Sequence, residues 1–137
     1  MYSEKILNRF NEPKFAGRFT GTVSGEAKNE YGDFVKISLE INKEKIEKAR
    51  FNAFGCVLRV VYSDIFCELI TGRSIEEASL VSQNEVEKLA GEIPARKKGL
   101  ISLAPLAFAD AIKKYRRIQE KQRLAVIEAR KAKKNPE

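Results

Sequence analysis

A chain of 137 residues with 43% hydrophobic and 33% charged residues is expected to fold as one domain with a single core. It has no histidine, so Ser–His or Cys–His catalysis and Cys/His zinc sites are excluded. Its two cysteines, Cys56 and Cys67, are too few for a disulfide-stapled secreted domain. No apolar run approaches the roughly 20 residues that span a bilayer, and the N-terminus does not resemble a secretory signal. These features predict a cytoplasmic protein without a membrane span.

The positive charge is concentrated at the C-terminal end. The formal net charge is +7, and residues 113–137 hold ten Lys/Arg against three Glu, whereas residues 1–112 hold sixteen of each sign. This pattern predicts a neutral body and a basic extension. The extension is either a surface for an acidic protein, RNA or an anionic membrane, or simply a solvated helix end.

The first half of the chain predicts a helix followed by strands. Residues 2–10 have helical periodicity, and residues 13–32 are rich in glycine and predict loop and short strand. Residues 34–41 and 49–53 alternate between apolar and polar side chains, which indicates two half-buried strands in a hairpin. The apolar set should face the core, and its members are Val35, Ile37, Leu39, Ile41 and Phe51.

The second half predicts helices. An apolar helix spans residues 57–71 and ends before Gly72, and capping boxes begin at Ser74 and Ser82. Residues 91–99 predict a basic loop. A long helix follows from about residue 103 to 133, with Pro105 in its first turn. This order of elements predicts the α+β class.

Five motifs stand at consistent spacing: YSEKIL at residues 2–7, NEP at 11–13, GDFVK at 32–36, FNAFGC at 51–56 and ELITGRSIEEA at 68–78. Together they resemble the NifU N-terminal, or IscU-like, family of iron–sulfur cluster assembly scaffolds. The resemblance implies a small three-stranded antiparallel sheet packed against helices, with a long C-terminal helix. It also implies a domain at residues 1–115 and a basic helical extension at 116–137.

The resemblance implies a degenerate ligand site. Family members hold a nascent cluster or metal ion with three cysteines, an aspartate and sometimes a histidine. Here the aspartate matches Asp33 and the second cysteine matches Cys56, whereas Tyr31 stands where the first cysteine is expected. Gly99 and Leu100 stand where a His-Cys pair is expected. The candidate cofactor-binding and metal-binding residues are therefore Cys56 and Asp33 alone.

One thiolate and one carboxylate make an incomplete site, because iron–sulfur clusters are usually held by several thiolates. A cluster or metal ion could therefore be held only in an incomplete site or in a site shared between two chains. Tyr31 either binds ferric iron as a phenolate or fills the pocket as packing. Cys67 is expected to be a buried hydrophobe. Cys56 precedes a helix, whose dipole and free amides favour an anion, and it is the strongest candidate for chemistry; the alternative is an inert cysteine.

Two classes of function remain open from the sequence. One is a divergent scaffold-like or accessory protein of iron–sulfur assembly that accepts sulfur or metal at Cys56 and Asp33. Its partner would be a cysteine desulfurase or another assembly protein, or a second copy of the chain. The other is a non-catalytic interaction module that keeps the scaffold fold but has lost cluster binding. It would dock an acidic protein or RNA on the former active face and the basic extension. Neither requires an enzyme, since no acid–base constellation is visible.

Overall fold

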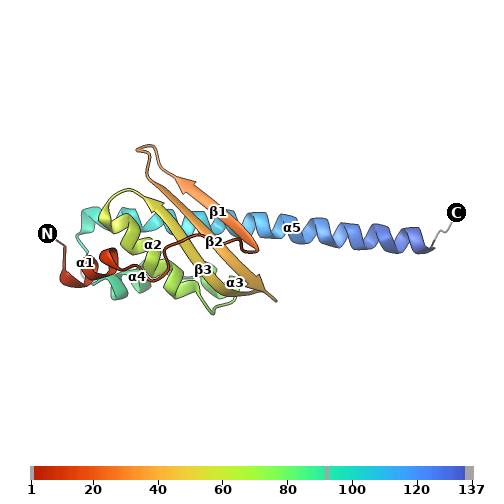
Figure 1. Ribbon diagram of the computed structural model, residues 1–137, viewed down its shortest axis with the longest axis horizontal. Coiled ribbons are helices and arrows are strands. Elements are labelled where there is room, and N and C mark those ends of the chain that lie inside the picture. Colours follow the sequence, from red (N-terminus) through yellow and green to blue (C-terminus); the bar gives the residue numbers. More distant parts are fainter. Residues whose placement is uncertain (1, 92, 135–137) are drawn as a thin grey trace.

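The computed structural model describes residues 2–91 and 93–134, and Figure 1 shows their arrangement. The elements in chain order are α1 (Glu4–Asn11), β1 (Val23–Lys28), β2 (Phe34–Asn42), β3 (Lys45–Phe54), α2 (Val57–Ile70), α3 (Ile75–Ser79), α4 (Gln83–Ala90), the 3₁₀ helix η1 (Ala95–Ser102) and α5 (Leu103–Lys134). The predicted α+β class and the long C-terminal helix are confirmed. The predicted loop at 91–99 is partly wrong, because the eight-residue 3₁₀ helix η1 begins inside it at Ala95.

The sheet has the order β1-β2-β3, with both neighbouring pairs antiparallel. The β2–β3 hairpin turns at Lys43 and Glu44, which both have positive φ. All five strand residues predicted for the core are at most 7% exposed. Their alternation therefore places one face of the sheet against the helices, as it must when apolar residues occur with a period of two.

Helices α2 and α5 cover that face of the sheet. The rings of Phe66 on α2 and Phe108 on α5 meet edge to face with centroids 5.8 Å apart. Strand β1 approaches α5 closely at Gly25, where any Cβ would clash with the backbone of Ala107 and Ala111. Small residues on both elements thus allow the backbones to pack directly, and they fix the position of α5 on the sheet.

A buried ion pair joins the N-terminal helix to the core. Asp64 on α2 is fully buried, and its carboxylate accepts a hydrogen bond from Arg9 at 2.8 Å and from the backbone N–H of Phe15 at 2.7 Å. Because a buried carboxylate is costly without such partners, this contact holds α1 and the following loop against α2.

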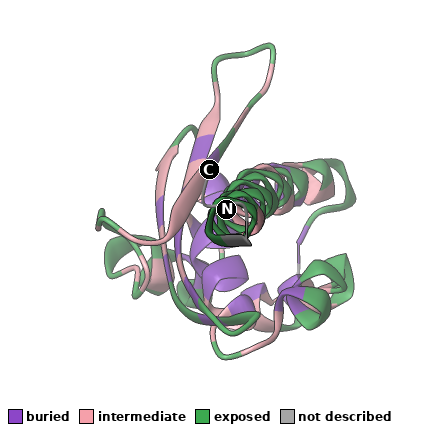
Figure 2. Cartoon of the chain, turned by 90° about the vertical axis from the view of Figure 1, so that its right-hand side faces the viewer, coloured by how far each residue is buried: buried purple, intermediate pink, exposed green. Residues whose placement is uncertain are grey.

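Helix α5 continues past the body of the protein. Figure 1 shows its C-terminal part projecting alone, and Figure 2, which looks towards the C-terminal end, shows it largely exposed. Within residues 2–91 and 93–134, the last polar contacts of α5 with the body are those of Arg116 and Gln119 with Glu44. The helix runs without a break through residue 115, where the sequence predicts a boundary between domain and extension.

Candidate functional site

Two of the candidate residues lie at the end of the sheet beside the start of α2. Asp33 immediately precedes β2 and Gly55 immediately follows β3. The pairing of Phe34 with Phe54 places both residues at the same end of the sheet. Gly55 has a φ of +150°, and a Cβ on it would lie 3.1 Å from Cγ of Asp33. Cys56 is the next residue. Glycine is therefore needed here both for the backbone conformation and for the close approach of the aspartate.

Cys56 occupies the N-cap position of α2. Its side chain is exposed, and it makes no capping hydrogen bond to the helix. Its carbonyl accepts a hydrogen bond from the N–H of Arg59 at 3.0 Å, which begins the helix. The thiol is thus presented to solvent where the first N–H groups of a 14-residue helix are directed.

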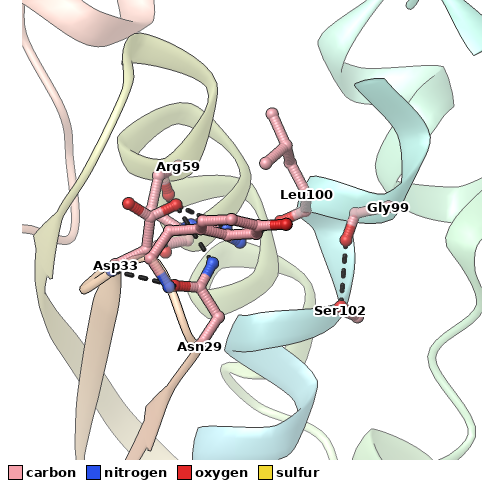
Figure 3. A network of polar contacts seen from close by, with 8 residues as sticks. Asn29, Asp33, Arg59, Gly99, Leu100 and Ser102 are labelled. Carbon is pink, nitrogen blue, oxygen red and sulfur yellow. Dashed lines mark hydrogen bonds and ion pairs between the residues drawn. The ribbon is translucent and has the colours of Figure 1, made fainter. Parts of the chain in front are cut away.

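Arg59 is the central residue of the site, and the sequence reasoning missed it. Its guanidinium donates through Nη2 to Oδ2 of Asp33 at 2.9 Å and through Nη1 to the carbonyl oxygen of Leu100 at 2.6 Å (Figure 3). The residue is 2% exposed, and no acceptor for its Nε lies among the described residues. The feature of the sequence that indicates a buried cation here is an arginine inside an otherwise apolar stretch, VLRVV at 57–61.

The loop between β1 and β2 orients the aspartate. The side-chain oxygen of Asn29 accepts hydrogen bonds from the backbone N–H groups of Tyr31 and Asp33 at 2.9 and 3.0 Å. The Asn29 amide donates to Oδ2 of Asp33 at 3.3 Å. The Arg59 guanidinium, helped by Asn29, holds the pKa of the Asp33 carboxyl below its ordinary value although partial burial opposes this. Asp33 is therefore ionised and already paired at neutral pH.

The positions of the missing ligands behave differently from one another. Tyr31 is 83% exposed, so the interpretation that it packs into a vacated pocket is wrong. The loop turns it outward because its backbone is tied to Asn29. Gly99 and Leu100 lie in η1, where the Leu100 carbonyl faces Arg59 and the Gly99 carbonyl accepts from Ser102 at 2.9 Å (Figure 3). The structure thus brings Leu100, but not the ring of Tyr31, into the network.

The second cysteine lies away from this site. Cys67 is fully buried in the core between the sheet and the helices, and burial raises the pKa of its thiol. The expectation that Cys67 serves as a small buried hydrophobe is confirmed.

The residues present do not fit a metal ion or cluster held by this chain alone. In the described part of the chain, no group of three or more His, Cys, Asp or Glu side chains could hold a metal ion. The Asp33 carboxylate, which lies against Gly55, the residue before Cys56, is bound to a buried guanidinium. The site offers a single exposed thiol next to a fixed ion pair.

An apolar groove of about 600 Å³ lies nearby, between α4, η1 and the start of α5. It is lined by residues such as Phe66, Val86 and Leu106, and it includes Gly99 but neither Cys56 nor Asp33. The groove is therefore separate from the candidate site.

Among the described residues, no helix is both long enough and apolar enough to cross a membrane.

The three-stranded sheet covered by α2 and α5, with Asp33 and Gly55 at one end of it, is the fold of the NifU N-terminal, or IscU-like, class. The model of the NifU-like N-terminal domain matches residues 1–122, and the chain belongs to that family. The iron–sulfur cluster assembly scaffold protein IscU of Escherichia coli K12 is 31% identical over 129 residues, which cover 87% of this chain and 97% of that relative. IscU 1 of Archaeoglobus fulgidus is 30% identical over 84% of this chain and 76% of its own length.

Solved structures show the same fold. A scaffold protein described as putative, for the SUF system of Fervidobacterium islandicum, superposes with a TM-score of 0.66 at 21% identity, covering 80% of this chain and 95% of that chain. A NifU-like N-terminal protein of Brucella abortus gives a TM-score of 0.64 at 14% identity, with coverages of 84% and 94%. At these identities the likeness establishes the fold alone.

Proposed function

We propose that this protein works in iron–sulfur cluster assembly as a scaffold-related accessory protein that accepts sulfur at Cys56. The relatives named as assembly scaffolds support the process. The observation that carries the particular role is the exposed Cys56 thiol at the start of α2, beside an Asp33 carboxylate that Arg59 already neutralises. A thiol in this setting can receive sulfur without needing further ligands.

The proposed reaction is a transfer of one sulfur atom from a donor persulfide, such as that of a cysteine desulfurase. The Cys56 thiolate attacks the outer sulfur of the donor, and a new S–S bond forms at Cys56. The S–S bond of the donor breaks, and its electron pair stays on the inner sulfur, which leaves as a thiolate. The donor becomes a thiol and Cys56 becomes a persulfide, with no net oxidation. The role is stoichiometric and needs no general acid or base from this chain.

Mass spectrometry after incubation with a cysteine desulfurase and cysteine tests this role. The peptide containing Cys56 should gain the mass of one sulfur atom, and reduction should remove it. A Cys67→Ala variant should be labelled as the wild type is, because Cys67 is buried. A Cys56→Ser variant should not be labelled. Absence of added sulfur on Cys56 while the desulfurase turns over would refute the role.

Anaerobic reconstitution with iron and sulfide separates sulfur acceptance from cluster assembly. A desalted monomer should show no persistent cluster absorption, because each chain supplies one accessible thiolate. A cluster that appears only in a dimer, and is lost in Cys56→Ser, would instead support a site shared by two copies.

A second candidate function is an interaction module that docks an anionic partner on α5. Residues 113–134 carry ten Lys/Arg and two Glu, and the part beyond Gln119 projects from the body (Figure 1). At 3.6 residues per turn the basic positions of residues 113–133 are distributed around the helix instead of along one face, which suits a phosphate backbone contacted without sequence preference. RNA binding that weakens steeply with salt supports this candidate; equal binding of an acidic polypeptide would favour a protein partner.

A further inference from the structure

The guanidinium of Arg59 lies where the ligand positions converge. It joins Asp33, which precedes β2, to the main chain of Leu100 in η1, and it starts from the first turn of α2, three residues after Cys56. Three of the positions that the family resemblance assigns to ligands are thus grouped around one arginine. Arg59 is 2% exposed and its guanidinium is held by two directed hydrogen bonds, so the position of this cation is fixed.

We infer that Arg59 takes the place of a metal ion in this protein and sets the specificity of the site against divalent cations. The positive charge satisfies the Asp33 carboxylate and the Leu100 carbonyl, two oxygen atoms that a metal ion could otherwise use. A divalent cation entering the site would find both oxygen atoms already bonded to Arg59. It would also be repelled by the guanidinium charge, which burial leaves weakly screened. The site therefore rejects cations and leaves Cys56 as its only reactive group.

The local packing shows that this arrangement is built in. Cβ of Arg59 would lie 3.3 Å from a Cβ on Gly55, so the arginine stem packs directly against the turn that carries Cys56. The Ser63 hydroxyl donates to the Arg59 carbonyl at 2.7 Å, one turn further along α2. The inference concerns cation binding and stands whether or not Cys56 carries sulfur, so it can fail while the proposed function holds, and the reverse.

Titration with Co²⁺ under anaerobic conditions tests the inference, because cobalt–thiolate bonding gives an intense absorption. The full-length wild type and Arg59→Lys, which keeps a cation, should bind Co²⁺ weakly and without thiolate absorption. Arg59→Ala should bind at least tenfold more tightly, with thiolate absorption that disappears when Cys56→Ser is added. Circular dichroism should confirm that each variant is folded, and Arg59→Met, which keeps more of the volume, replaces the alanine variant if that does not fold.

Restoring the missing ligands gives a second test. Tyr31→Cys with Leu100→Cys adds two thiols yet retains the main-chain carbonyl that Arg59 binds. This double variant should still fail to retain a reconstituted iron–sulfur cluster as a monomer, whereas adding Arg59→Ala should allow it. Equal Co²⁺ affinity in the wild type and the neutral variants, or equal cluster retention with and without Arg59, would overturn the inference.

Discussion

Arg59 binds Asp33 through an ion pair of 2.9 Å between Nη2 and Oδ2. The arginine is almost completely buried, whereas the aspartate side chain is 24% exposed. The pair differs from a surface salt bridge because one partner cannot be hydrated if the other is removed. Removal of the carboxylate leaves a buried cation, and removal of the arginine leaves an aspartate that water can still reach. The consequences of substituting the two residues are therefore unequal.

Asp33→Asn should lower the free energy of unfolding by about 1.5–3 kcal/mol at pH 7, the range for a hydrogen bond to a charged group. Because the folded state lowers the pKa of Asp33, its stabilising contribution is complete above the unfolded pKa of about 3.9 and is lost as the pH falls through the folded value. The difference between wild type and variant should be constant above about pH 5 and shrink below about pH 4.

Urea unfolding at several pH values measures this difference. The backbone-bonded carboxylates Glu77, Glu85 and Asp110 also have lowered pKa values, but they are common to both proteins and cancel in the comparison. A difference that persists unchanged to pH 3 would show that the ion pair does not stabilise the fold.

The two cysteines should react at very different rates. In the native protein, a thiol-specific reagent should label Cys56, which is exposed, and spare Cys67, which is fully buried. Native Cys56→Ser should not be labelled, and both cysteines of the wild type should react in denaturant. Rapid labelling of native Cys67 would show that α2 separates from the sheet more readily than its packing implies.

Gly25→Ala should be strongly destabilising, because the added Cβ meets the backbone of α5 at Ala107 and Ala111. Overpacking of this kind costs about 1–3 kcal/mol or more. Gly99→Ala is a matched control, since a Cβ there meets nothing within 4 Å and the change should stay within about 0.5 kcal/mol. Thermal unfolding of the two variants compares them, and equal melting temperatures would contradict the close contact of β1 with α5.

Charge reversal at exposed positions of α5 should reduce binding to RNA. The variant Lys121→Glu, Arg130→Glu, Lys131→Glu changes residues that lie on the projecting part of the helix. The matched control Lys14→Glu, Lys43→Glu, Lys88→Glu makes the same change in net charge on the body. Fluorescence anisotropy should show a loss of tenfold or more, and a shallower salt dependence, for the helix variant only. Equal losses in both variants would mean that net charge alone attracts RNA.

The sequence by itself determined most of the fold. Alternation in residues 34–41 and 49–53 predicted the hairpin and the core face, and the serines at 74 and 82 predicted two capping boxes that the structure contains. These are local signals, in which a side chain's period or its neighbour three residues away fixes the outcome. The strand at 23–28 lacked such a signal, because its pairing with β2 depends on residues distant in the sequence.

The candidate site was predictable only in part. Matching motifs by position identified Asp33 and Cys56, and the structure sets Asp33 against Gly55, beside Cys56. The role of Arg59 could not be predicted, because its partners lie 26 and 41 residues away in the sequence. Only the tertiary structure brings a loop, the start of a helix and a 3₁₀ helix to one point, and only there does the arginine become a buried cation with two oxygen acceptors. The sequence determines which ionisable groups the site contains. Which of them pair, and how strongly, depends on the burial and the distances that the tertiary structure creates.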